Sequence, residues 1–163
     1  MENNIKIAIV PGSFDPITAG HIDIVSRAAE LYDKVYLAVM INDQKNYMFT
    51  MEQRTEIAKA AVSVIDNVEV ISSDGMLWEL AKRLGAVAIV KGYRNDTDLE
   101  YEKRMAEFNS EKNPDAMTVL LKSKVELASL SSTYVREKIK NKERIDGLLP
   151  QEAVDIIKKL TDL

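Results

Sequence analysis

The stretch IKIAIVPGSFDPITAGH, residues 5–21, decides the fold. Its first six residues form an apolar run that predicts a buried strand over 5–10. Two glycines, two prolines and the only histidine of the chain follow within the next eleven residues. A helical pattern of apolar residues then covers 21–34. A strand that turns sharply into a helix is the first unit of a β-α arrangement.

Strands and helices are expected to alternate along the rest of the chain. Thr50, with Gln53 three residues later, is typical of a helix capping box, so a helix is expected from there to about residue 65. Apolar runs predict strands over 35–41, 68–72, 86–90 and 117–122, and helical periodicity predicts helices over 76–85, 97–112, 131–140 and 150–160. The order predicts an α/β fold, a doubly wound parallel sheet of five strands, with residues 1–163 in a single domain.

Composition narrows the class of protein. The 163 residues suit one core, and 46% hydrophobic with 29% charged residues is an ordinary soluble mixture. A net charge of −4 argues against nucleic-acid or membrane-surface binding, which needs a basic footprint. The absence of cysteine excludes disulfides, thiolate metal sites and a cysteine nucleophile. Without a signal-peptide core or a long apolar run, a cytoplasmic protein is expected.

Glycines and cations gather where the predicted strands end. In parallel α/β sheets, ligands bind outside these carboxyl ends, and helix N-termini bind anions. The turn before His21, the loop with Lys45, the run KGYR (91–94) and the segment SST (131–133) therefore predict a phosphate site. Neither the G-x-G-x-x-G fingerprint nor a Walker P-loop is present. On composition alone, the first turn is equally explained as a tight connection, whereas Lys45 taken alone is better explained as a solvated charge.

The segment GSFDPITAGH resembles the G-[ST]-F-D-P-x-T-x-G-H signature of the HxGH nucleotidyltransferase superfamily, with Thr18 where the first histidine often stands. The segments KNYMFT, KGYRNDTDLEYE and SLSSTYVRE extend the resemblance to the bacterial phosphopantetheine adenylyltransferase family over essentially the whole chain. The resemblance implies a Rossmann-like nucleotidyltransferase fold. The implied reaction transfers AMP from ATP to 4′-phosphopantetheine, giving dephospho-coenzyme A and pyrophosphate in coenzyme A biosynthesis. It also implies Mg²⁺, a homohexamer and feedback binding of coenzyme A.

The resemblance also assigns roles to residues. It implies that His21, Lys45 and Arg94 are catalytic, with His21 stabilising the transition state. The implied ATP-binding residues are Ser13, Phe14, Thr18, His21, Gly92, Tyr93, Arg94, Glu102, Leu130, Ser131, Ser132 and Thr133. The implied residues for the second substrate are Ser13, Lys45, Leu77 and Lys91. The chain departs from the family at Lys91, which is usually arginine, and at Asn46, which is often a second lysine. No metal site formed by protein side chains is expected.

Several of these residues have simpler explanations. A solvated acidic face explains Asp98 and Glu102, which are four residues apart on a predicted helix. The helical spacing of Tyr101, Met105 and Phe108 predicts that these side chains pack in the core.

The simplest expectation for the segment from Met76 to Trp78 is that its side chains pack in the core. Any of Ser131–Thr133 can cap the next helix, where Arg136 opposes the helix dipole unless an anion lies there.

Two rival functions stay open. One is another superfamily member, such as a cytidylyltransferase or a nicotinamide-mononucleotide adenylyltransferase. The other is a silent regulator that binds ATP and releases no pyrophosphate.

Overall fold

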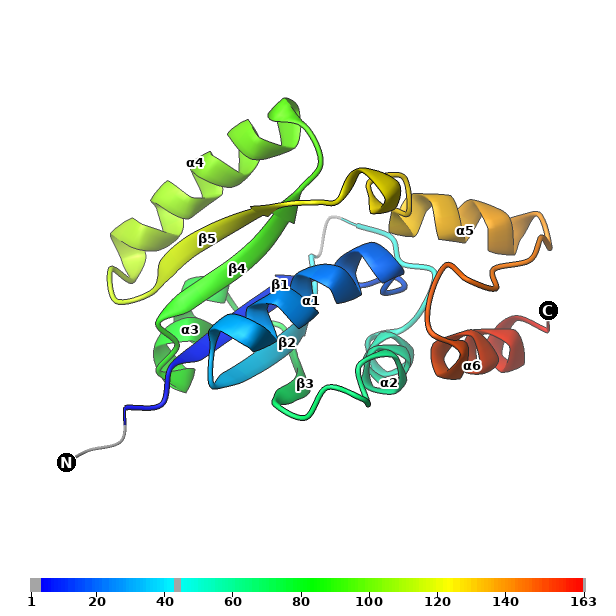
Figure 1. The fold of residues 1–163 in the computed structure, drawn as a ribbon, viewed down its shortest axis with the longest axis horizontal. Helices are drawn as coiled ribbons and strands as arrows, with labels where there is room; N and C mark the ends of the chain where they lie inside the picture. The colour runs from blue at the N-terminus through cyan, green and yellow to red at the C-terminus, as the bar shows by residue number, and fades with distance from the viewer. Residues whose placement is uncertain (1–3, 43–44, 163) are drawn as a thin grey trace.

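Five parallel strands form one sheet in the order β3-β2-β1-β4-β5 (Figure 1). The computed structural model describes residues 4–42 and 45–162. The strands are β1 (Ile7–Gly12), β2 (Lys34–Met40), β3 (Val68–Ser73), β4 (Ala88–Tyr93) and β5 (Met117–Lys122). The chain adds β2 and β3 on one side of β1, then crosses to add β4 and β5 on the other. The switch in strand order therefore lies between β1 and β4, where α/β sheets bind ligands.

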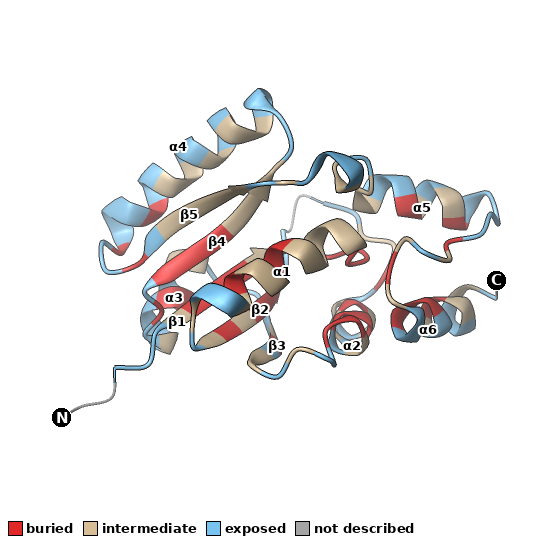
Figure 2. Ribbon diagram, in the orientation of Figure 1, coloured by how far each residue is buried: buried red, intermediate tan, exposed pale blue. Residues whose placement is uncertain are grey.

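Apolar residues cover both faces of the central strand. Ala8 and Val10 belong to the larger core cluster, and Ile9, which points the other way, belongs to the smaller one. Central parallel strands are covered by helices on both faces, so a continuous apolar run suits β1. Figure 2 shows the buried residues concentrated along β1, β2 and β4 and on the inner sides of the helices.

Helices cover the two faces unequally. On the larger core lie α1 (Ala19–Leu31), α2 (Met51–Ala61), α5 (Ser132–Lys140) and α6 (Gln151–Thr161). On the smaller core lies α3 (Leu77–Leu84), with α4 (Asp96–Lys112) beside it over β4 and β5. A short 3₁₀ turn, η1 (Val125–Leu127), precedes α5. No helix in the described part of the chain is long and apolar enough to cross a membrane.

The predicted doubly wound parallel sheet of five strands is confirmed, with shifted boundaries. Helix α1 begins at Ala19 rather than residue 21, because Thr18 is its N-cap, so His21 lies in the first turn. Strand β4 extends to Tyr93, so Lys91, Gly92 and Tyr93 lie within the strand rather than after it. The 3₁₀ turn was not predicted. Residues 43 and 44 of the predicted loop lie outside the described residues.

The prediction that Tyr101, Met105 and Phe108 form core is wrong for both aromatic residues. Tyr101 is 53% exposed and Phe108 is 38% exposed, and Met105 is half-buried. Asn109 is the one buried residue of α4. The helix covers only the edge of the sheet at β4 and β5, so one side of it faces outward.

Candidate active site

A cavity of about 980 Å³ opens at the carboxyl ends of β1 and β4. Its walls come from the β1–α1 turn, the β2–α2 loop, β4 with the start of α4, and the segment from η1 to α5. These are the positions that the sequence singled out at the strand ends. The predicted site residues that line the cavity are Ser13, Phe14, Thr18, His21, Lys45, Lys91, Gly92, Arg94, Glu102, Leu130, Ser131, Ser132 and Thr133.

His21 is held in one tautomer by the start of α1. The backbone N–H of Thr18 donates to His21 Nδ1 at 3.0 Å, and Thr18 Oγ1 lies 3.2 Å from the same nitrogen. Because Nδ1 accepts, a neutral imidazole carries its proton on Nε2. Burial, and then the positive charge of Arg94, lower the pKa of His21 to about 4. At neutral pH the ring is therefore an uncharged Nε2–H donor in the cavity wall.

The turn after β1 has a constrained backbone. Phe14 has φ of 48°, in the left-handed region, and its buried ring meets the His21 ring edge-on at 5.2 Å. A Cβ at position 12 would lie 2.8 Å from Phe14 Cζ, so any other residue there would force the Phe14 ring to shift. The Phe14 N–H finds no hydrogen-bond acceptor among the described residues. The turn thus offers a free donor to a ligand in the cavity.

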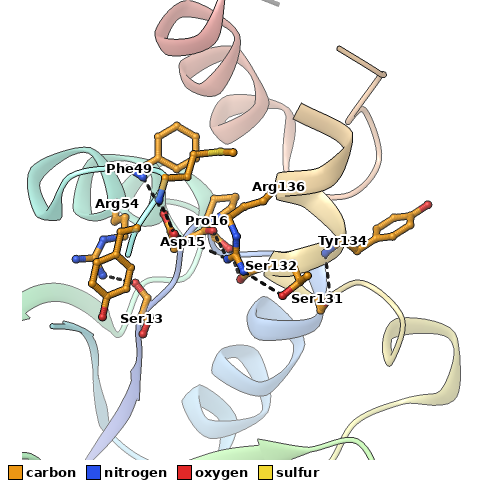
Figure 3. A network of polar contacts seen from close by, with 12 residues as sticks. Ser13, Asp15, Pro16, Phe49, Arg54, Ser131, Ser132, Tyr134 and Arg136 are labelled. Atoms are coloured by element: carbon orange, nitrogen blue, oxygen red, sulfur yellow. Dashed lines mark hydrogen bonds and ion pairs between the residues drawn. The ribbon is translucent and has the colours of Figure 1, made fainter. Parts of the chain in front are cut away.

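Asp15 links three segments of the site (Figure 3). Its carboxylate is buried and accepts from the backbone N–H groups of Met48 and Phe49, both at 2.9 Å. Arg136, at the middle of α5, donates to the Asp15 carbonyl at 2.8 Å and lies 3.8 Å from its carboxylate. Asp15 is therefore the anion that offsets Arg136 near the start of α5.

Two cations at the end of β4, Lys91 within the strand and Arg94 directly after it, are paired with acids of α4. Lys91 Nζ lies 2.6 Å from Glu102 Oε2, and Arg94 Nε lies 3.0 Å from Asp98 Oδ2. Burial raises the pKa of Asp98, but hydrogen bonds from the Arg94 side chain and backbone outweigh it and lower that pKa below its ordinary value. Asp98 and Glu102 are thus parts of ion pairs, which does not fit the simpler explanation of a merely solvated acidic face, and the role of Glu102 in ATP binding stays a prediction.

The start of α5 closes the cavity on the side of α1. Ser131 is its N-cap and accepts from the Tyr134 N–H at 3.1 Å. Ser132 Oγ donates to the Pro16 carbonyl at 2.8 Å, which joins α5 to the β1–α1 turn. Thr133 Oγ1 accepts from Arg136 at 3.0 Å. Lys45 is exposed and lines the cavity from the β2–α2 loop.

Two predicted residues are not among those that line the cavity. Tyr93 is half-buried at the end of β4, and Leu77, the first residue of α3, packs against the smaller core cluster. Their binding roles stay predictions. Sequence reasoning missed Arg54 of α2, which is 1% exposed and donates to two backbone carbonyls at the strand ends. The one available sequence signal was the position of Arg54 in the capped helix after the Lys45 loop.

Comparison with known proteins agrees with this architecture. The family model described as cytidylyltransferase-like matches residues 9–138. The phosphopantetheine adenylyltransferase of Clostridium botulinum is 40% identical over 156 residues, which cover 95% of this chain and 98% of the relative. The chain belongs to the phosphopantetheine adenylyltransferase family.

Two more members of the family support the assignment. The phosphopantetheine adenylyltransferase of Streptococcus gordonii is 41% identical over 157 residues, covering 96% of each chain. That of Caldanaerobacter subterraneus is 45% identical over 133 residues, covering 82% of this chain and 83% of the relative. The chain is therefore a nucleotidyltransferase, and the resemblance of its motifs to this family is confirmed.

Proposed function

We propose that this chain transfers the adenylyl group of ATP to 4′-phosphopantetheine, giving dephospho-coenzyme A and pyrophosphate in coenzyme A biosynthesis. Membership of the family supports the reaction. The observation that carries it is the Nε2–H of His21, fixed by Thr18 at the start of α1 in a cavity lined by Lys91 and Arg94. A neutral donor beside two cations suits a reaction between two polyanions.

The chemistry needs no protein nucleophile. A phosphate oxygen of 4′-phosphopantetheine, already ionised, attacks the α-phosphorus of ATP, and the bond from that phosphorus to the bridging oxygen of pyrophosphate breaks. The protein has to align the two phosphates and stabilise the charge that develops on the α-phosphate oxygens. His21 Nε2–H, Lys45 and Arg94 are the groups proposed for this role. The positive end of the α1 helix dipole, at its N-terminus, is proposed to add to this stabilisation.

The two substrates are proposed to meet at the β1–α1 turn. ATP would lie between this turn, β4 and the start of α5, where the predicted ATP-binding residues lie. The phosphate of 4′-phosphopantetheine would lie near Ser13, Lys45 and Lys91, with its pantetheine arm toward Leu77. Phosphate binding at β4 has to compete with Glu102 for Lys91, because the two side chains are paired at 2.6 Å.

Mg²⁺ is proposed to reach the site on the phosphates of ATP. This ion keeps several water ligands and favours nucleotide phosphates. The carboxylates that line the cavity are engaged, because Asp15 accepts from two backbone N–H groups and Asp98 and Glu102 pair with cations. Within the described residues, no group of three or more histidine, cysteine or acidic side chains is placed to hold a metal. The ion would neutralise phosphate charge.

Three further properties are proposed on the strength of the resemblance. They are assembly as a homohexamer, feedback binding of coenzyme A in the substrate cavity, and a cytoplasmic location, where ATP is available. The exposed aromatic side of α4, with Tyr101 and Phe108, is compatible with contact between copies.

Pyrophosphate release tests the function. The purified chain is given ATP and Mg²⁺ with or without 4′-phosphopantetheine, beside His21→Ala and the control Lys82→Ala at an exposed position of α3. Release that requires the acceptor and falls about 100- to 1000-fold in His21→Ala, but not in the control, is expected. ATP binding without release in the presence of the acceptor contradicts the proposal and favours the silent regulator. Release with a different acceptor favours another superfamily member.

A further inference from the structure

Arg54 is the one arginine among the buried polar and charged residues of the described chain. It is 1% exposed and lies on α2, a helix fixed at its start by the reciprocal hydrogen bonds of Thr50 and Gln53. Its Nε is buried with no hydrogen-bond partner in the described structure. Burying a guanidinium with an unpaired N–H is costly. A buried arginine that carries such a cost indicates a specific task.

One guanidinium nitrogen joins the ends of two neighbouring strands. Arg54 Nη1 donates to the carbonyl of Ser13 at 2.7 Å and to the carbonyl of Met40 at 3.1 Å (Figure 3 shows the first contact). Met40 ends β2, and Ser13 follows the last residue of β1. Arg54 therefore fixes the relative position of the two carboxyl ends that form the floor of the site.

The contact with Ser13 also sets the direction of the next N–H. The bond between Ser13 and Phe14 is a trans peptide, in which the carbonyl and the N–H point in opposite directions. With the Ser13 carbonyl directed at Arg54, the Phe14 N–H points away from Arg54. Ser13 and Phe14 line the cavity and Arg54 does not. The unpaired Phe14 N–H is thereby held as a donor for an anion in the cavity.

The guanidinium plane supports the loop that carries Lys45. The Tyr47 ring stacks on it, with Arg54 Cζ 4.0 Å from the ring centroid. The Tyr47 hydroxyl accepts from the backbone N–H of Asn42 at 2.6 Å, and the Lys45 N–H donates to the Asn42 carbonyl at 3.0 Å. Arg54 thus contacts the residue that closes this loop, without contacting the cavity itself.

We propose that Arg54 is a positioning residue for adenylyl transfer, which aligns the Phe14 N–H and the Lys45 loop on a common support. The proposal rests on the proposed function, and adds to it a residue that acts through Ser13, Met40 and Tyr47. Lysine cannot replace it, because a point charge provides neither the planar surface for Tyr47 nor the fixed directions of a guanidinium.

Steady-state kinetics of Arg54→Lys, with Arg83→Lys at an exposed position of α3 as the matched control, test the role. Misalignment of reacting groups lowers kcat, so a fall of about 10- to 100-fold is expected in Arg54→Lys. The KM for ATP should change much less, because the lost alignment acts mainly in the transition state. A merely structural role lowers the melting temperature and the fraction of folded protein but leaves kcat per folded molecule unchanged. That result overturns the proposal.

An NMR measurement tests the same residue without turnover. The chain has three phenylalanines, Phe14, Phe49 and Phe108, so ¹⁵N-Phe labelling gives three backbone amide signals. In ligand-free Arg54→Lys, the Phe14 signal should move and the Phe108 signal, on α4, should not. An unmoved Phe14 signal contradicts the proposal even if the wild type proves inactive. If the wild type releases no pyrophosphate but the Phe14 signal moves, the proposed function fails and the positioning of the turn stands.

A second pair of variants applies if Arg54→Lys does not fold. Tyr47→Leu removes the ring that stacks on the guanidinium, whereas Tyr47→Phe keeps the ring and removes only the hydroxyl. Tyr47→Leu should have the lower kcat, because it loses the stacking on Arg54 as well as the hydroxyl contact with Asn42, whereas Tyr47→Phe loses only the second. A wild-type kcat in both variants overturns the link to the Lys45 loop.

Discussion

At the scale of single residues, His21 makes a prediction that NMR can test directly. As the only histidine of the chain, it gives one imidazole signal set. Burial and the charge of Arg94 lower its pKa to about 4, so titration of the free protein should show a neutral ring down to about pH 5. Bound ATP should raise this pKa, because phosphate charge favours the imidazolium. A free-protein pKa near 6.5 would contradict the half-buried, Nδ1-bonded ring.

The same lowered pKa predicts a loss of stability in acid. Between pH 6.5 and 4 the unfolded chain binds a proton at His21 that the folded chain does not, so the free energy of unfolding falls as the pH falls. The loss is about 1 to 3 kcal/mol. Urea unfolding at pH 7 and pH 4.5 should show this decrease in the free energy of unfolding in the wild type and not in His21→Gln. Equal pH dependence in the two proteins would contradict it.

The sequence predicted His21 and its neighbours better than it predicted the arginines that hold them. A glycine-rich turn at a strand end is a local pattern, visible in the printed chain. Arg54 donates to the backbone carbonyls of Ser13 and Met40, which are distant in sequence. Every residue has such a carbonyl, so the residue types at these positions do not indicate the contact. The anion near Arg136 is Asp15, 121 residues away. Contacts of this kind arise only when strand ends come together, so no local pattern reveals them.

At the scale of elements, the ion pair Lys91–Glu102 connects β4 to α4 and predicts a non-additive effect. Lys91→Met should raise the KM for 4′-phosphopantetheine about 10- to 100-fold, because it removes a cation and leaves the Glu102 carboxylate beside the phosphate. In Lys91→Met/Glu102→Gln that repulsion is absent, so the KM should recover in part. A double variant worse than the sum of the single effects would contradict the pairing.

Asp15 predicts how the loops at the strand ends depend on each other. In Asp15→Asn the amide accepts from one of the Met48 and Phe49 N–H groups and directs its own N–H₂ at the other. One buried donor is then unpaired and Arg136 loses its anion, which costs about 2 to 4 kcal/mol in the free energy of unfolding. Chemical denaturation beside the exposed control Asp74→Asn measures the loss. A change as small as that of the control would contradict the network.

In helix α4 the apolar pattern of the sequence did not predict how the side chains pack. Periodicity correctly placed Tyr101, Met105 and Phe108 on one stretch of helix but assigned the aromatic residues to the core, whereas they are exposed. An apolar stripe indicates that one face of a helix packs against another part of a protein, but it does not indicate which part. Here the sheet beneath α4 consists of β4 and the edge strand β5, too narrow to bury the whole stripe.

At the scale of the whole molecule, strand order determines the site. The alternation of strands and helices predicted the sheet, but not that β1 lies between β2 and β4, because local patterns carry no information on which strands pair. The pairing brings residues of the β1–α1 turn, β4 and α5 to one cavity. A ligand there contacts segments that are more than a hundred residues apart in sequence.

This arrangement predicts where ATP slows amide hydrogen exchange. With Mg²⁺ and ATP, protection should increase in three separate stretches, 12–21, 91–104 and 127–136, because the ligand bridges the segments that line the cavity. Helix α6, which does not line it, serves as the internal control and should exchange at an unchanged rate. Protection confined to 12–21 would mean that ATP contacts only the β1–α1 turn. Equal protection in α6 would mean that ATP stabilises the molecule globally rather than by bridging the cavity walls.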